Sequence, residues 1–218
     1  MKKILLSGIM ALLLIACSNT RITSSWKAGN TGSKQYKKIL VLGLINEPDR
    51  SIRENMEEQL VGELKELGYD AVCSCDEFGP KAFDKIDEKT ALAKLSSSGI
   101  DGVLTVVLLD KERERYYVPG HMSYTPYSVY HRQFWGYYNT MYTRVYSPGY
   151  YDTDTKYFWE SNFYDLSGGQ ELLYSVQSQS FESGSTKKLG HQYGQLIMED
   201  MVKNNILVNQ KEVKLKPM

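Results

Sequence analysis

Residues 102–109 read Gly-Val-Leu-Thr-Val-Val-Leu-Leu, and this stretch decides the fold. It carries no charged residue and is rich in β-branched side chains. A continuous apolar run of this length is typical of a strand that is buried on both faces, as in the middle of an α/β sheet. We therefore expect residues 101–109 to form the central strand.

Two strand–helix units precede this strand. Residues 38–45 (KILVLGLI) form a short apolar run, and residues 46–67 carry apolar side chains three or four positions apart, which predicts an amphipathic helix. Residues 69–75 predict a second strand and residues 87–98 a second helix. Strands that alternate with helices at this spacing predict right-handed parallel crossovers.

The central strand continues into residues 110–115, which read DKERER. On a strand, Lys111, Arg113 and Arg115 share one face and the three acidic residues share the other. Two interpretations stay open for this stretch. It is either a solvated strand extension with cross-strand ion pairs or a charged surface that faces a partner, with the cationic row pointing outward.

Residues 116–164 hold 13 of the 17 tyrosines and two of the three tryptophans. Tyrosine combines flat apolar area with a hydroxyl group, which suits interfaces. Three uses stay open: packing on the domain's own core, binding of a protein or peptide partner, and stacking on a glycan. The candidate aromatic anchors for a partner are Tyr116, Tyr117 and Trp135. Balanced charge in this segment argues against nucleic acid.

The remaining chain predicts strands at 135–146, 155–166 and 170–181 and a closing helix at 186–205. We predict one α/β (α+β) domain over residues 38–209, with a mixed sheet of five to six strands and three helices in the order β-α-β-α-β-β-β-β-α. Residues 116–153 form a Tyr-rich insertion, and residues 210–218 form a frayed tail.

The N-terminus predicts a secretory signal over residues 1–16, with two lysines before a short apolar core. The sequence Leu14-Ile15-Ala16-Cys17 resembles the bacterial lipobox. The resemblance implies cleavage after Ala16 and a lipid anchor on Cys17, whereas the alternative is an ordinary cleaved signal with an incidental cysteine. Residues 17–37 are polar and predict a flexible tether of about 25 Å.

The residues after Cys17 bear on location. Ser18 stands where, by resemblance to enterobacterial lipoproteins, an acidic residue favours retention in the inner membrane, and residues 18–21 lack an acidic surface-export cluster. We therefore expect a lipid-anchored cell-envelope protein on the periplasm-facing side of the outer membrane. Cleavage after Ala16 removes Lys2 and Lys3, leaving 26 − 2 = 24 basic residues against 26 acidic ones, a net charge of −2.

Few residues carry a recognisable chemistry. The chain has no Gly-rich phosphate loop, no HExxH and no G-x-S-x-G sequence. We predict no catalytic residues, no metal site and no cofactor, although a triad assembled from distant residues stays open. Cys73 and Cys75 are interpreted as small buried residues on a strand; a redox pair or half of a metal site is the alternative.

Several short motifs carry a resemblance: Ser24-Ser25-Trp26-Lys27 after the lipobox, then residues 117–120 (YVPG), 134–138 (FWGYY), 146–150 (YSPGY) and 160–165 (ESNFYD). Together they resemble a family of small Bacteroidetes lipoproteins that carries no established activity and brings no functional residues. At fold level, the strand–helix order is similar to the N-terminal domain of TolB and to the periplasmic domains of LpoB and CsgG. That similarity says little about function.

From these features we expect a non-enzymatic envelope lipoprotein. It binds a protein partner through the charged strand extension and the Tyr-rich segment. The alternative is a module that binds peptidoglycan or another glycan through its tyrosines and tryptophans. An enzyme of unknown reaction is the third class.

Overall fold

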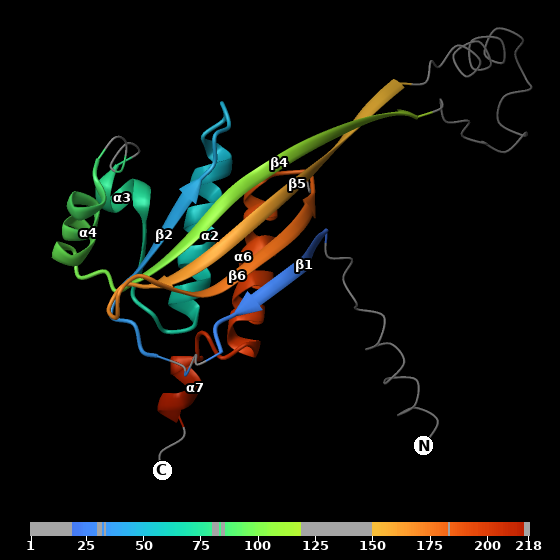
Figure 1. The fold of residues 1–218 in the computed structure, drawn as a ribbon. Helices are drawn as coiled ribbons and strands as arrows, with labels where there is room; N and C mark the ends of the chain where they lie inside the picture. The colour runs from blue at the N-terminus through green and yellow to red at the C-terminus, as the bar shows by residue number, and fades with distance from the viewer. Residues whose placement is uncertain are drawn as a thin grey trace, which may run out of the picture. The chain divides into compact units, whose positions relative to one another are not determined.

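The computed structural model describes residues 19–29, 32, 34–79, 83, 86–118, 150–182 and 184–215. The chain divides into two compact units. Residues 1–111 and 156–218 form the first, here called the body, and residues 112–155 form the second, here called the extension. The described strands form one six-stranded sheet in the order β1-β6-β5-β4-β2-β3 (Figure 1).

The elements alternate as the sequence predicts over its first half. The strands are β1 (Thr20–Lys27), β2 (Ile39–Leu44), β3 (Ala71–Cys73), β4 (Gly102–Val118), β5 (Tyr150–Asp165) and β6 (Glu171–Phe181). The helices are α2 (Ser51–Glu66), α3 (Ser74–Phe78), α4 (Glu88–Ser97), α6 (Thr186–Lys203) and α7 (Gln210–Leu215).

The sheet is mixed, which confirms the predicted fold class. β2 pairs in parallel with β3 and with β4, so the strands that flank α2 and α4 are joined by crossovers, as predicted. β6 pairs antiparallel with both β5 and β1. The central position of β4 follows from its composition, because Leu104 and Val106 are fully buried.

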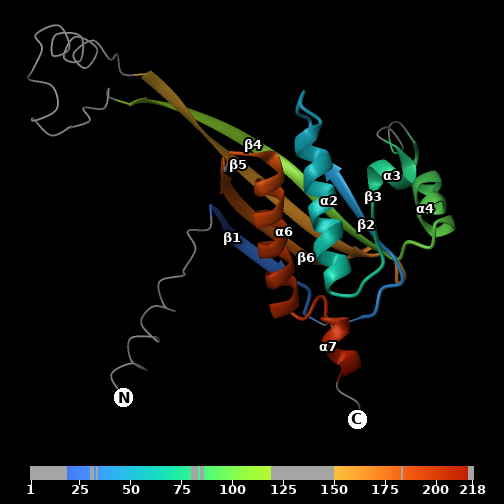
Figure 2. The same cartoon turned by 180° about the vertical axis from the view of Figure 1, so that it is seen from behind.

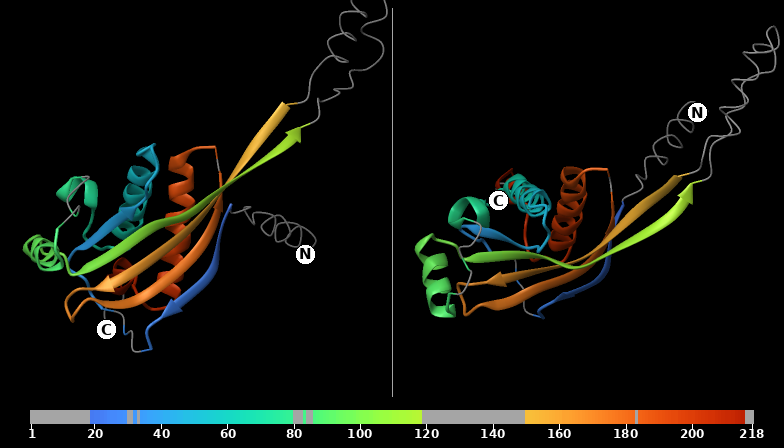
Figure 3. Two further views of the ribbon diagram at one scale, coloured as in Figure 1. Left: turned by 45° about the horizontal axis from the view of Figure 1, so that its top comes forward. Right: turned by 90° about the horizontal axis from the view of Figure 1, so that it is seen from above.

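Two helices cover one face of the body's sheet. α2 and α6 lie side by side over it (Figures 1 and 2). The main core lies beneath them and includes Met56, Leu60, Trp159, Tyr193 and Ile197. α4 lies on the opposite side of the sheet (Figure 3), where Leu95 packs with Leu40, Ile100 and Val103 in a smaller cluster.

A glycine sets the close approach of α6 to α2. A Cβ atom at position 190 would lie 3.0 Å from the backbone oxygen of Asn55. At position 194 the nearest atom would be Cγ of Glu63, at 3.2 Å, which belongs to a flexible side chain. The backbone of α2 is nearer at position 190 than at position 194, where the closest backbone atoms, of Gln59, would lie at an ordinary contact distance of 3.7 Å.

The predicted tether is the main difference from the sequence analysis. Residues 20–27, which we expected in a flexible linker, form β1 and pair with β6, with Thr20 opposite Ser180 and Lys27 opposite Tyr174. This strand was missed because its Ser and Thr residues are also common in loops. Most of β1 is exposed, so burial left no apolar signal in its sequence.

Other boundaries also differ. The second strand ends at Cys73 and α3 follows, so Cys75 lies on a helix and not on the predicted strand. The predicted frayed tail contains α7, whose Gln210 N–H donates to the backbone oxygen of Leu67 at 2.9 Å. The described part of the chain thus has five helices where three were predicted. The predicted strand at 135–146 lies outside the described residues.

Candidate functional site

One end of the body gathers three chain connections. β4 leaves the body after Lys111 and β5 re-enters it at Lys156. Lys156 lies opposite Phe181 in the β5–β6 register, and the Phe181 N–H donates to the backbone oxygen of Asn19 at 2.9 Å. We call the region around Asn19, Lys111, Lys156 and Phe181 the anchor end, because Asn19 lies two residues after Cys17.

Lys111, the first residue of the predicted cationic row, is held inside the body. Its Nζ lies 2.7 Å from Glu47 Oε2 and 5.4 Å from the centre of the Tyr157 ring. Only 16% of its side chain is exposed. The prediction that this lysine faces outward is therefore wrong. Glu47 follows β2, whose last residue, Leu44, lies opposite Val107 on β4, so the acid that pairs with Lys111 comes from a distant part of the sequence.

The other candidate residues belong to the extension. Arg113 and Arg115 are exposed. Tyr116 and Tyr117 lie on β4, but their side chains are outside the described part, and Trp135 lies outside the described residues altogether. The partner-binding role of Trp135 and of the other four residues stays a prediction.

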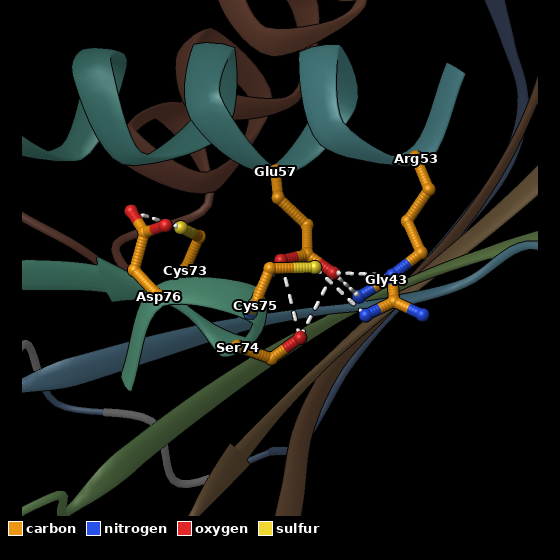
Figure 4. Close-up of polar contacts among 7 residues, drawn as sticks. All are labelled: Gly43, Arg53, Glu57, Cys73, Ser74, Cys75 and Asp76. Atoms are coloured by element: carbon orange, nitrogen blue, oxygen red, sulfur yellow. Dashed lines mark hydrogen bonds and ion pairs between the residues drawn. The ribbon is translucent and has the colours of Figure 1, made fainter. Parts of the chain in front are cut away.

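A buried carboxylate cluster is the feature that the sequence analysis missed (Figure 4). Glu57 on α2 is fully buried. Its Oε1 accepts from the Gly43 N–H at 2.8 Å and from Arg53 Nε at 3.2 Å. The Ser74 hydroxyl donates to both oxygens, at 2.9 and 3.1 Å, and the Cys75 N–H reaches Oε2 at 3.3 Å. One carboxylate thus joins α2, the end of β2 and the start of α3.

A glycine makes room for this cluster. A Cβ atom at position 43 would lie 2.8 Å from Glu57 Oε1 and 2.9 Å from Arg53 Cγ. The sequence carries a signal for the cluster, because Glu57 lies between Met56 and Leu60 on the apolar stripe of α2. A charged residue on a buried stripe requires internal partners.

The two cysteines beside the cluster point apart (Figure 4). Cys73 Sγ donates to Asp76 at 2.8 Å, and Cys75 Sγ accepts from Arg53 Nη2 at 2.8 Å. Both are free thiols. Burial, together with the hydrogen bond to Asp76, raises the pKa of the Cys73 thiol to about 12. Burial and the charge of Glu57 raise the pKa of Cys75, against the opposing effect of Arg53. At neutral pH both thiols are therefore protonated.

A polar cavity of about 730 Å³ lies at the end of the body away from Phe181. Its rim includes Lys34, Lys37 and the β5–β6 turn at Ser167 to Gln170. Asp101 also lines it, but its oxygens accept the backbone N–H groups of residues 37 and 38 at 2.9 to 3.1 Å. The hydroxyl, amide and ammonium groups of this cavity suit a polar ligand.

Within the described ranges, no three His, Cys, Asp or Glu side chains are placed to hold a metal ion. None of the helices in that part of the chain has the length and apolar character needed to cross a membrane.

Neither the protein-family models nor the curated protein sequences give a match to this chain. Among solved structures, it is similar to the PelC dodecamer of Paraburkholderia phytofirmans, with a TM-score of 0.45 and 12% identity over 86% of this chain and 98% of that one. It is also similar to lipoprotein GNA1162 of Neisseria meningitidis, with a TM-score of 0.41 and 15% identity over 77% of this chain and 99% of that one.

A PDZ domain protein of Parabacteroides distasonis gives a TM-score of 0.37 at 10% identity, over 90% of this chain and 39% of that one. At these scores the likenesses carry no argument about function. The functional argument therefore rests on the chain's own residues.

Proposed function

We propose that the protein is a non-enzymatic lipoprotein of the cell envelope, anchored through Cys17 on the periplasm-facing side of the outer membrane. The extension then binds a protein partner. The observation that carries this proposal is the anchor end, where Asn19, two positions after Cys17 in the sequence, is hydrogen-bonded to Phe181 and where β5 re-enters the body at Lys156.

The distribution of tyrosines supports a binding role for the extension. Eleven of the 17 tyrosines lie in residues 112–155. The body's core has its own aromatic residues, such as Trp159, Phe163 and Tyr174. Tyrosine is enriched at protein interfaces, so its concentration in residues 112–155 suits a binding role for the extension.

The chemistry of the body supports a non-enzymatic role. The buried Glu57 carboxylate accepts from four internal donor groups, which leaves it a structural link and not a base that faces a substrate. The raised pKa values of Cys73 and Cys75 keep both thiols protonated, and a protonated thiol is a poor nucleophile.

Crosslinking in intact envelopes followed by affinity capture tests the partner. We expect the double variant Arg113→Glu/Arg115→Glu to reduce capture of the crosslinked partner, because charge at an interface sets the association rate. Trp135→Ala should speed its release, because buried aromatic side chains dominate affinity. The control is Lys65→Glu/Lys89→Glu, which makes the same change of charge at exposed positions on the body.

Unchanged capture by both extension variants, with native circular dichroism, refutes the partner proposal. The anchor has a separate test. Cys17→Ser should move the protein from the membrane to the soluble envelope fraction or block its processing. A processed protein that stays on the membrane shows that the lipobox interpretation is wrong.

The polar cavity supports peptidoglycan binding as a second candidate. Its lysines and hydroxyl groups suit the carboxylates and hydroxyls of a cell-wall glycopeptide. Co-sedimentation of the protein with purified peptidoglycan tests this candidate. Binding that survives Trp135→Ala and is lost in Lys37→Glu assigns it to the cavity and not to the Tyr-rich segment.

A further inference from the structure

We infer that the anchor end of the body is a membrane-contact surface, which places Phe181 at the lipid interface and Lys187 and Lys188 against anionic phospholipid headgroups. This inference rests on the proposed lipid anchor at Cys17. It adds an orientation of the body and a lipid class, neither of which follows from lipidation alone.

The distance along the chain carries the first step. Asn19 is hydrogen-bonded to Phe181 at 2.9 Å, so its position in the body is fixed. Asn19 lies two positions after Cys17, and an extended chain spans at most about 3.6 Å per residue. A lipid on Cys17 is therefore attached within about 7 Å of Asn19. An anchor this short keeps the anchor end of the body close to the bilayer.

The side chains at this end suit a lipid interface. Phe181 is one of the few large apolar side chains of the body that are exposed, with 36% of its surface accessible. Lys156 Nζ lies 5.9 Å from the centre of its ring. An aromatic ring beside a long cationic side chain is typical of residues that sit at the level of the headgroups.

The first turn of α6 supplies the second, independent observation. Lys187 and Lys188 are exposed there, and the turn contains no acidic residue. A helix N-terminus carries a partial positive charge, so cations are unfavourable at this position unless an anion faces them. The hydroxyl of Ser185 accepts the Lys188 N–H at 3.2 Å and so caps the N-terminus of α6. No acidic side chain performs this capping, so none offsets the charge of the two lysines there.

The charge balance of the segment that leads into α6 favours an anionic surface. Over residues 181–188, the exposed Lys187 and Lys188 stand against one exposed acid, Glu182. This local excess of positive charge contrasts with the net charge of −2 expected for the processed chain. Juxtamembrane basic residues are attracted to leaflets that contain anionic lipid.

Photocrosslinking of the full-length, lipidated protein tests the orientation. Benzophenylalanine is placed at Phe181 or, as the control, at exposed Glu171, the other end of β6. The two positions lie about 33 Å apart along the strand. The protein is reconstituted into vesicles of phosphatidylethanolamine with phosphatidylglycerol, or of phosphatidylcholine alone, and lipid adducts are measured by mass spectrometry.

We expect lipid adducts at position 181 and none above background at position 171. In the anionic vesicles, Lys187→Glu/Lys188→Glu should lower the yield at 181 by about threefold, whereas Lys65→Glu/Lys89→Glu should leave it unchanged. The yield in phosphatidylcholine should not respond to either double variant. Equal yields at 181 and 171 in vesicle-bound protein overturn the orientation while leaving the anchor intact.

An unchanged yield in the Lys187→Glu/Lys188→Glu protein overturns the assignment of anionic headgroups. Protein that fails to float with the vesicles overturns the lipid anchor and the orientation together. The three failures are therefore distinguishable.

Discussion

Replacing Glu57 is the sharpest test of how the body holds together. The two oxygens of Glu57 accept from Gly43, Arg53, Ser74 and Cys75. In Glu57→Gln one oxygen becomes an NH₂ group, which is a donor. The amide can place its NH₂ group at the position of Oε1 or of Oε2. The Oε2 position is the better one, because the Cys75 N–H that it then faces makes the longest of these contacts, 3.3 Å. Oxygen then remains for Gly43 and Arg53.

The expected magnitude follows from the donors that lose their acceptor. A buried polar group without a partner costs about 1–3 kcal/mol, so Glu57→Gln should lower the free energy of unfolding by that amount. Glu57→Leu removes the acceptor for all four donors and takes away the carboxylate that pairs with Arg53. Breaking a buried ion pair from one side costs about 3–5 kcal/mol, so this variant should be the more destabilised.

Urea unfolding of the unlipidated Cys17→Ser protein, followed by circular dichroism, measures the effect. The matched control is Glu58→Gln, the same change at the next position of α2, where the side chain is exposed. It should change the free energy of unfolding by less than about 0.5 kcal/mol. If Glu57→Gln behaves like Glu58→Gln, or if Glu57→Leu is as stable as the parent, the cluster does not link α2, β2 and α3 as argued.

Two further predictions follow from the same packing. Burial and the charge of Glu57 raise the pKa of Cys75. Glu57→Gln should therefore lower the pKa of Cys75 and speed its alkylation by iodoacetamide at pH 8, measured by mass spectrometry of the labelled peptide. An unchanged alkylation rate contradicts this prediction. Gly190→Ala should lower the urea midpoint because its Cβ would lie 3.0 Å from the backbone oxygen of Asn55. At position 194 the nearest atom belongs to the flexible Glu63 side chain and the Gln59 backbone is at an ordinary 3.7 Å, so Gly194→Ala should be neutral or stabilising by up to about 1 kcal/mol. If Gly194→Ala loses more stability than Gly190→Ala, this packing argument is wrong.

The parallel half of the fold could be predicted because burial leaves a pattern in the sequence. β2 and β4 are buried on both faces and read as continuous apolar runs. α2 and α6 are covered on one side and carry apolar stripes. For each of these strands and helices, the burial in the folded protein and the local sequence pattern favour the same secondary structure. Their predicted positions therefore agree with the structure to within a few residues.

The cluster around Glu57 could not be predicted in the same way. Its members lie at positions 43, 53, 57, 74 and 75, and a spacing rule connects only Arg53 and Glu57, which lie four residues apart on α2. They meet only because β2 pairs with β3 in parallel, which brings the end of β2 beside the start of α3. The ion pair between Lys111 and Glu47 has the same origin, 64 residues apart in sequence. Contacts of this kind depend on topology and become visible only once the sheet order is known.

The strand β1 limits how far a lipid on Cys17 would let the body move from the bilayer. A flexible linker over residues 17–37 would allow the body to turn freely at about 25 Å from the bilayer. Because β1 begins at Thr20 and pairs with β6 along its length, the free chain shrinks to the residues just after Cys17. The extension starts from this same end, since β4 leaves the body at Lys111 beside Tyr157 and β5 returns at Lys156. If Cys17 carries the lipid, crosslinking in intact envelopes keeps the body at its natural distance from the membrane, and it is therefore a better assay for a partner of the extension than capture with a soluble, unlipidated protein.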